Sequence, residues 1–313
     1  SPFFRDALVG DYGLLTLGVF NAFVTVLPIL SVYFLIMGFI EDIGYLPNLT
    51  VLTRRVLGKI GLSGRSIMSL ILGFGCKTMA TLTTRGIASR RERYISIYLI
   101  AFAIPCSAQL AIDMAILGRV GFLAFIIAYG TLAIVEIGAG YILNKILKEE
   151  ERADFIQELP PIRLPDIGAI LKKTGYRLYW FLKEAVPIFA VASVVLFLAD
   201  FSGILTAAKT FLNPVVTGWL GLPIDIVEVL ILSLARHEAA AGFLLRMVDN
   251  GELNYVQSIV AVVITTMFVP CFANIVAMCK QIGVGKGLVM TLSINGSAFI
   301  LAGVLNWILV AIF

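Results

Sequence analysis

Residues 94–117, YISIYLIAFAIPCSAQLAIDMAIL, form one apolar run with a proline and a cysteine at its centre. A hydrocarbon core of about 30 Å is crossed by roughly 20 apolar residues in a helix, so this run predicts a transmembrane helix. A proline inside a helix removes a backbone donor and opens the turn before it. In lipid, such an opening persists only where it is buried in protein or lines a wet cavity. The run therefore predicts a spanning helix that is opened near its middle.

The whole chain has the same apolar character. Of its 313 residues, 59% are hydrophobic and 14% are charged, and the mean hydropathy is +0.97. A soluble domain carries roughly 25% charged residues, which excludes a water-soluble globule. Two apolar runs, 66–84 and 225–245, are interrupted by GFGCK and ARHE and predict broken or re-entrant segments. Full spans are expected at about 12–40, 94–117, 119–147, 184–200, 255–279 and 287–313.

The basic residues predict the orientation. They gather at 54–65, 85–93, 145–183 and 280–286, which places these segments on the cytoplasmic side by the positive-inside rule. The long polar stretch 148–180 is then a cytoplasmic linker, with a short amphipathic helix near 166–178. We expect a multi-pass membrane protein.

The two halves of the chain repeat each other. Pro105-Cys106-Ser107-Ala108 matches Pro270-Cys271-Phe272-Ala273 at an offset of 165. Gly61-Leu62 matches Gly221-Leu222 at an offset of 160, and the charge pattern orients the halves oppositely.

The predicted fold class is an all-α polytopic membrane protein of two inverted repeats, each with spanning helices and one broken or re-entrant segment. Residues 1–147 form the first repeat, 148–183 the linker and 184–313 the second repeat. Inverted repeats with interrupted helices are typical of transporters that bind their cargo near the membrane midplane. The alternative is a duplicated structural bundle with no path through it.

Cysteines next to opened turns are candidate metal ligands. Cys106 and Cys271 lie at equivalent depths of the two halves, and Cys76 lies in the glycine-containing GFGCK segment. Thiolates suit Fe(II), Cu(I) and Zn(II), whereas the alternative reading is that these cysteines only fill helix contacts. His237 is the one histidine in the chain, which excludes a site made of several histidines.

Acids within apolar segments are costly and are usually paired or functional. On this ground Glu238 is a further candidate metal ligand. Its neighbour His237 has a different alternative, membership of a buried polar pair. Lys77 would repel a cation and is expected to snorkel or to pair with an acid. The remaining candidates for gating or pathway roles are Glu41, Asp42, Asp200, Glu136, Asp113 and Ser107. The alternative is that such residues are solvated helix ends or members of buried pairs.

Several motifs together resemble a known family. They are GFIEDIGYL at 38–46, GLSGRS at 61–66, GFGC at 73–76, TTRGIASRRER at 83–93, IPCSAQL at 104–110, ELPPIRLP at 158–165, ARHEA at 235–239 and FVPCFANI at 268–275. In this order they resemble the membrane domain of the ferrous iron transport protein B family, which is built from two gate, or nucleoside-recognition, repeats. The resemblance implies an Fe(II) transporter of bacterial or archaeal inner membranes, with Cys76, Cys106 and Cys271 as pore ligands.

The sequence also departs from that family. After GFGC the family usually has an Asn and then a Pro, whereas this chain has Lys77, Thr78 and Met79. The family's GTPase domain is not in this sequence, so we expect either a fragment or a stand-alone protein that works with a separate GTPase, and no enzyme activity of the chain itself.

The leading hypothesis is a transporter of a divalent transition metal, with Fe(II) foremost. No tightly bound cofactor and no nucleic acid are expected, and the partners are the lipid bilayer, a separate or excised GTPase domain and, as a candidate, further copies of the chain. One alternative is an organic solute such as a nucleoside, held by Lys77, Arg236, Asn274 and Gln109. A second alternative is a non-transporting scaffold that anchors a GTPase.

Overall fold

The computed structural model describes residues 24, 27–147, 165–201, 210, 212–235, 237–268 and 271–312. These residues form helices joined by turns, with no strand among them, which confirms the all-α fold class. In chain order the elements are α2 (Leu27–Asp42), α3 (Tyr45–Lys59), α4 (Gly64–Gly75), α5 (Lys77–Thr83), the 3-10 turn η3 (Thr84–Gly86), α6 (Arg90–Phe102), α7 (Ser107–Val120), α8 (Phe122–Ile146), α9 (Ile167–Phe201), the π-helical η4 (Pro214–Trp219), α11 (Ile226–Ala235), α12 (His237–Asp249), α13 (Tyr255–Met267), α14 (Phe272–Ile282) and α15 (Val284–Ile312).

Four stretches of the described chain are long and apolar enough to cross a membrane. They coincide with four of the six predicted spans. Of the other two predicted spans, 12–40 begins outside the described residues and 184–200 lies inside α9. The four stretches are Arg90–Val120, Phe122–Ile146, Tyr255–Ile282 and Val284–Ile312.

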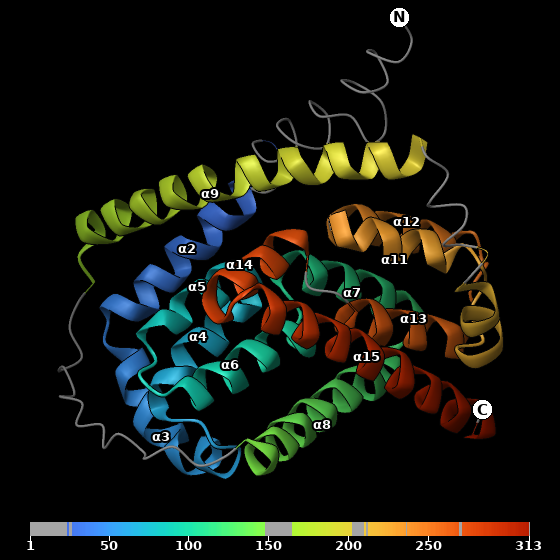
Figure 1. Cartoon of the computed structure of the whole chain (residues 1–313), viewed down its shortest axis with the longest axis horizontal. Coiled ribbons are helices and arrows are strands. Elements are labelled where there is room, and N and C mark those ends of the chain that lie inside the picture. Colours follow the sequence, from blue (N-terminus) through green and yellow to red (C-terminus); the bar gives the residue numbers. More distant parts are fainter. Residues whose placement is uncertain are drawn as a thin grey trace, which may run out of the picture.

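The spans containing the Pro-Cys motifs lie inside the bundle and the uninterrupted spans lie outside. In their most apolar windows, 67% of α6–α7 and 69% of α13–α14 are buried, against 17% of α8 and 33% of α15. Figure 1 shows α6, α7 and α13 in the interior of the view, with α8 along one edge and α9 along the opposite edge. Exposed side chains on the outer helices are large and apolar, such as Ile134 on α8 and Trp307 on α15. An exposed apolar face of this kind suits contact with lipid, because backbone groups in both helices are satisfied internally.

Helix α13 forms the centre of the main core. Its residues from Ser258 to Met267 are all buried, and it packs against α6, α7, α8, α11 and α15. A helix that is apolar all round is expected to be surrounded by other elements, and α13 is so surrounded.

All four predicted interruptions occur. Helix α4 ends at Gly75 and α5 begins at Lys77, so the first break falls at Cys76 inside GFGCK. Helix α11 ends at Ala235 and α12 begins at His237, within ARHE. The two Pro-Cys motifs also separate helices, α6 from α7 and α13 from α14. The prolines therefore correctly predict where the two central spans are opened.

Helix α9 differs from the sequence-based expectation. Instead of a separate amphipathic helix near 166–178, one continuous helix runs from Ile167 to Phe201 and includes Pro187. The boundary drawn after residue 183 therefore lies within a helix. Helix α9 packs along α2, where Thr174 Oγ1 donates to the Phe34 carbonyl at 3.3 Å. Packing against α2 outweighs the backbone hydrogen bond that Pro187 cannot make.

Polar contacts lie at both ends of the spans. At the end of α7 and α12, Arg119 and Asp249 form an ion pair. At the opposite end of the same spans, Lys286 Nζ donates to Tyr94 OH at 3.0 Å. Two further contacts lie at this basic end, from Asn144 Nδ2 to the Lys59 carbonyl at 3.2 Å and from Arg91 Nη2 to the Asn144 carbonyl at 2.6 Å.

Candidate functional site

Three cysteines occupy the same structural position, the residue just before a helix. Cys76 precedes α5 with extended dihedral angles (φ −150°, ψ 111°), Cys106 precedes α7, and Cys271 precedes α14. None of the three forms a disulfide, and all three are partly buried. The N–H groups at a helix N-terminus carry partial positive charge, which favours negative groups beside them.

Helix α5 brings the two Pro-Cys motifs together. Thr78 Oγ1 lies 3.7 Å from Cys271 Sγ, and Thr81 Oγ1 donates to Asn274 Oδ1 at 2.7 Å, so α5 contacts the start of α14. On the other side, Ser107 Oγ at the start of α7 donates to the Gly75 carbonyl at 3.0 Å. Residues 193 positions apart in the chain therefore meet around one short helix.

Lys77 lies at the centre of this arrangement. Its side chain is 2% exposed, and Nζ donates to the carbonyls of Ala101 at 3.4 Å and Thr266 at 3.3 Å. Lys77 does not snorkel, because its side chain is buried and its nitrogen is bound by backbone oxygens. The other expectation, that Lys77 pairs with an acid, stays a prediction.

The cysteines do not form a complete metal site in this conformation. Among the residues that the structure describes, no three His, Cys, Asp or Glu side chains lie close enough together to hold a metal ion. The contacts that place two of the cysteines are those with the α4–α5 break: Cys271 Sγ lies 3.7 Å from Thr78 Oγ1, and Ser107, next to Cys106, donates to the Gly75 carbonyl.

The acids at the end of α2 bind α9. Glu41 Oε2 accepts from Arg177 Nη2 at 2.8 Å. Asp42 is buried, accepts from the backbone N–H of Asp166 at 2.8 Å and lies 3.8 Å from Lys173 Nζ. These contacts join the two helices, whatever further role the acids have. Asp200 lies on α9, and its side chain is outside the described part of the structure.

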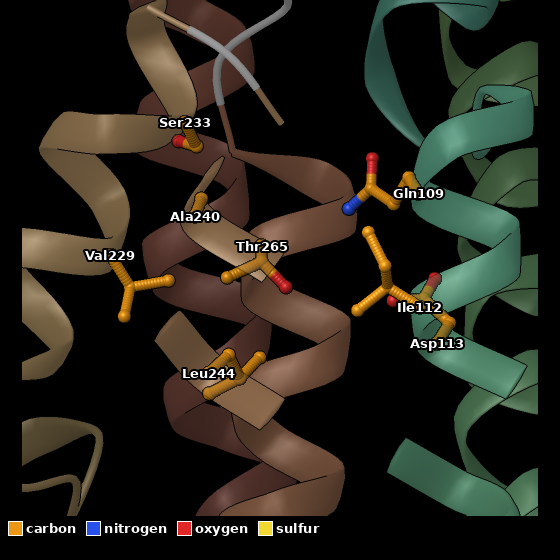
Figure 2. Close-up of a pocket in the computed structure, with 8 residues that line it drawn as sticks. All are labelled: Gln109, Ile112, Asp113, Val229, Ser233, Ala240, Leu244 and Thr265. Atoms are coloured by element: carbon orange, nitrogen blue, oxygen red, sulfur yellow. The ribbon is translucent and has the colours of Figure 1, made fainter. Parts of the chain in front are cut away.

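A small pocket with a mixed polar and apolar lining lies beside α7, between it and α11, α12 and α13. Figure 2 shows Gln109 and Asp113 on one wall, facing Thr265 and Ser233. Asp113 Oδ2 accepts from Thr266 Oγ1 at 3.1 Å, whereas Gln109 Oε1 is buried and has no hydrogen-bond partner among the described residues. The other lining residues are Ile112, Val229, Ala240 and Leu244.

Two more predicted residues have different outcomes. Glu136 lies midway along α8, and its Oε2 is a buried oxygen with no hydrogen-bond partner in the described part of the chain. His237 and Glu238 begin α12, and their side chains fall outside what the structure describes.

Comparison with known families accounts for most of the chain. The Gate family, described as nucleoside recognition, matches twice, at residues 23–123 and 182–285. The chain belongs to the Gate family. The segment between the two matches, residues 125–177, matches the C-terminal region of ferrous iron transport protein B. Both Gate matches contain one Pro-Cys motif, so the two openings described above lie in equivalent family segments.

Curated relatives of this Gate protein are named Fe(2+) transporter FeoB. The protein of Methanocaldococcus jannaschii is 27% identical over 82% of this chain and 43% of its own length. That of Synechocystis is 30% identical over 67% of this chain and 36% of its own length. That of Staphylococcus aureus strain COL is 31% identical over 64% of this chain and 30% of its own length. The chain thus spans less than half the length of these relatives, and no solved structure matches it significantly.

Sequence reasoning missed three residues of the Gate site. Thr78, Thr81 and Thr266 contact Cys271, Asn274 and Asp113 respectively. Isolated threonines in apolar segments carry no signal of their own, because a threonine can equally bond to the carbonyl one turn earlier. Only the approach of α5 to α14 and of α13 to α7 reveals these contacts.

Proposed function

We propose that this chain forms the membrane path for a divalent transition metal, Fe(II) foremost, across a prokaryotic cytoplasmic membrane. The observation that carries the proposal is that Cys76, Cys106 and Cys271 each lie at the start of a helix that follows a break in a buried segment. Thiolates are preferred ligands of such metals. The names of the curated relatives support Fe(II) among them. In this proposal the chain is a conduit and carries no catalytic residue.

The path runs between two inverted repeats, residues 1–147 and 184–313, joined by 148–183. Correspondences in the structure support this division. Helix α5 packs against α14 of the other half, and α12 packs against α7 in the same way. Gly61 and Gly221 both have positive φ, and each lies against an asparagine, Asn144 on α8 and Asn306 on α15. Equivalent contacts made by equivalent helices are what a repeat produces.

The ligand set that we propose is Cys106, Cys271, Cys76 and Glu238. Bringing three thiols onto one ion requires the repeats to move relative to the conformation described, because no complete metal cluster exists among the described residues. Such movement about a central site is the usual mode of transport in inverted-repeat proteins. Ser107, Glu41, Asp42, Asp200 and Glu136 remain our candidates for gating or lining the path.

The test is anaerobic Fe(II) flux into liposomes that contain the chain alone. We expect flux in the unmodified protein and its loss in a Cys106→Ala/Cys271→Ala double variant. Cys279→Ala is the matched control, because Cys279 lies at the far end of α14 and its thiol faces the Val284 carbonyl at 3.9 Å. Equal flux in the double variant and the control would disprove the cysteine-lined path.

A second candidate function is transport of a nucleoside or a similar polar solute. Two buried amides favour it: Gln109 Oε1 and Asn274 Nδ2 have no partner among the described residues, and each lies three residues after a Pro-Cys cysteine. The description of the Gate family is consistent with it. Nucleoside uptake that is indifferent to metals would favour this function over the first. Co-purification of a GTPase, with no solute flux even when that GTPase is added back, would favour a scaffold role instead.

A further inference from the structure

Two backbone carbonyls at the centre of the bundle are left without their usual helical donor. Ala101 lies four residues before Pro105, and Thr266 lies four residues before Pro270. A helical carbonyl normally accepts from the N–H four residues later, which proline lacks. The two positions are separated by 165 residues, the same offset that relates the two Pro-Cys motifs. Each half of the chain therefore contributes one such carbonyl.

A single side chain binds both of these carbonyls. Lys77 Nζ lies 3.4 Å from the Ala101 oxygen and 3.3 Å from the Thr266 oxygen. Ala101 is in the last turn of α6 and Thr266 is in the last turn of α13, so the ammonium faces two helix C-termini. The partial negative charge at a helix C-terminus stabilises a cation.

The surroundings of Lys77 are also suited to a cation. Thr266, whose carbonyl accepts from Lys77, also donates through Oγ1 to Asp113 Oδ2 at 3.1 Å, so a carboxyl group lies beside one of the two carbonyls. Burial of an unpaired charge would be costly, and hydrogen bonds to the two carbonyls offset part of that cost. The arrangement has the chemistry of an ion-binding site in which the broken ends of membrane helices supply carbonyl ligands.

We propose that the Ala101 and Thr266 carbonyls form a cation site built jointly by the two halves, with the Lys77 ammonium as its resident cation. The site would accept a free, weakly hydrated monovalent cation, such as ammonium or Rb⁺, if the lysine were shortened. Carbonyl oxygens are hard ligands of the kind that bind K⁺ in channel filters, whereas the thiols nearby suit transition metals. The proposal does not depend on what the protein transports.

The test compares two variants of the whole chain, purified in detergent, in which residue 77 carries no charge. The variants differ in how much of the space of the lysine side chain the new residue fills. Lys77→Met refills the volume of the side chain and leaves no room for an ion, whereas Lys77→Ala leaves the carbonyls open. We expect Lys77→Ala to bind ⁸⁶Rb⁺ about tenfold or more tightly than either Lys77→Met or the unmodified protein. Ammonium should compete for this binding, and tetramethylammonium, which has no N–H donor, should not.

The melting temperature provides a second readout. Ammonium chloride should raise the melting temperature of Lys77→Ala above its value in tetramethylammonium chloride, and leave the unmodified protein unchanged. Lys77→Ser allows the same measurements if Lys77→Ala does not fold. Lys280→Ala, which removes an exposed lysine from α14, is the control for loss of a positive charge elsewhere. Folded Ala or Ser variants that bind Rb⁺ no better than Lys77→Met would overturn the proposal.

Discussion

Asn274 is a fully buried residue whose position depends on one side chain of α5. Its Oδ1 accepts from Thr81 Oγ1 at 2.7 Å, and its Nδ2 has no acceptor in the described part of the chain. Thr81→Val keeps the shape and removes the donor, which leaves both ends of the amide unpaired. We expect it to lower the free energy of unfolding by about 1–3 kcal/mol, measured by denaturant titration in detergent micelles.

Thr217→Val is the matched control for this substitution. Thr217 is exposed, and its Oγ1 donates to the Asn213 carbonyl at 2.8 Å. Water can replace that bond, so the control should change the free energy of unfolding much less. Equal losses in the two variants would show that the bond between Thr81 and Asn274 is not a special constraint on α5.

Gly221 makes the turn before α11 possible. Its φ of 66° lies in the left-handed region, and a Cβ there would meet the side-chain amide of Asn306 on α15. We expect Gly221→Ala to reduce the free energy of unfolding by at least about 1 kcal/mol, because it adds a collision to the cost of the backbone conformation. Gly251→Ala is the control, because Gly251 has a φ of 73° and open space around it. This variant measures the cost of the backbone conformation without a collision. A Gly251→Ala loss as large as that of Gly221→Ala would exclude the collision.

At the scale of an element, the opening between α6 and α7 depends on one proline. Pro105→Ala restores the N–H that can bond to the Ala101 carbonyl and lets the helix continue through Cys106. We therefore expect reduced Fe(II) flux with no loss of thermal stability, measured in the liposome assay and by a melting curve. Pro214→Ala, at the exposed start of η4, is the control and should keep its flux. Full flux in Pro105→Ala would mean that the path does not need this opening.

At the scale of the molecule, the bundle has a basic end and an opposite end. Arg119 and Asp249 pair at one end of the spans, and Lys286 contacts Tyr94 at the other. In a Cys279→Ser background, Asp249→Cys should react with an impermeant thiol reagent on intact cells. Lys286→Cys should react only after the cells are opened, since basic segments stay in the cytoplasm. Labelling with the reverse sidedness would contradict the proposed orientation.

The sequence alone was sufficient for the class of fold and for the places where helices break. Length and hydropathy predict the spans, because a helix must satisfy its own backbone in lipid whatever surrounds it. The prolines and glycines predict the breaks at Cys76, Cys106 and Cys271, because their effect on the backbone is local. These predictions need no knowledge of which helices are neighbours.

Only the tertiary structure decided what surrounds those breaks. The position of Lys77 between the Ala101 and Thr266 carbonyls depends on α5 entering the space between two helix ends that are distant in the chain. Likewise, the continuity of α9 past residue 183 depends on its packing along α2. A charge inside a membrane protein is stabilised by whichever groups approach it in space, and the approach of distant helices is set by packing. For that reason the helices of this protein can be predicted from local sequence, whereas the carbonyl partners of Lys77 cannot.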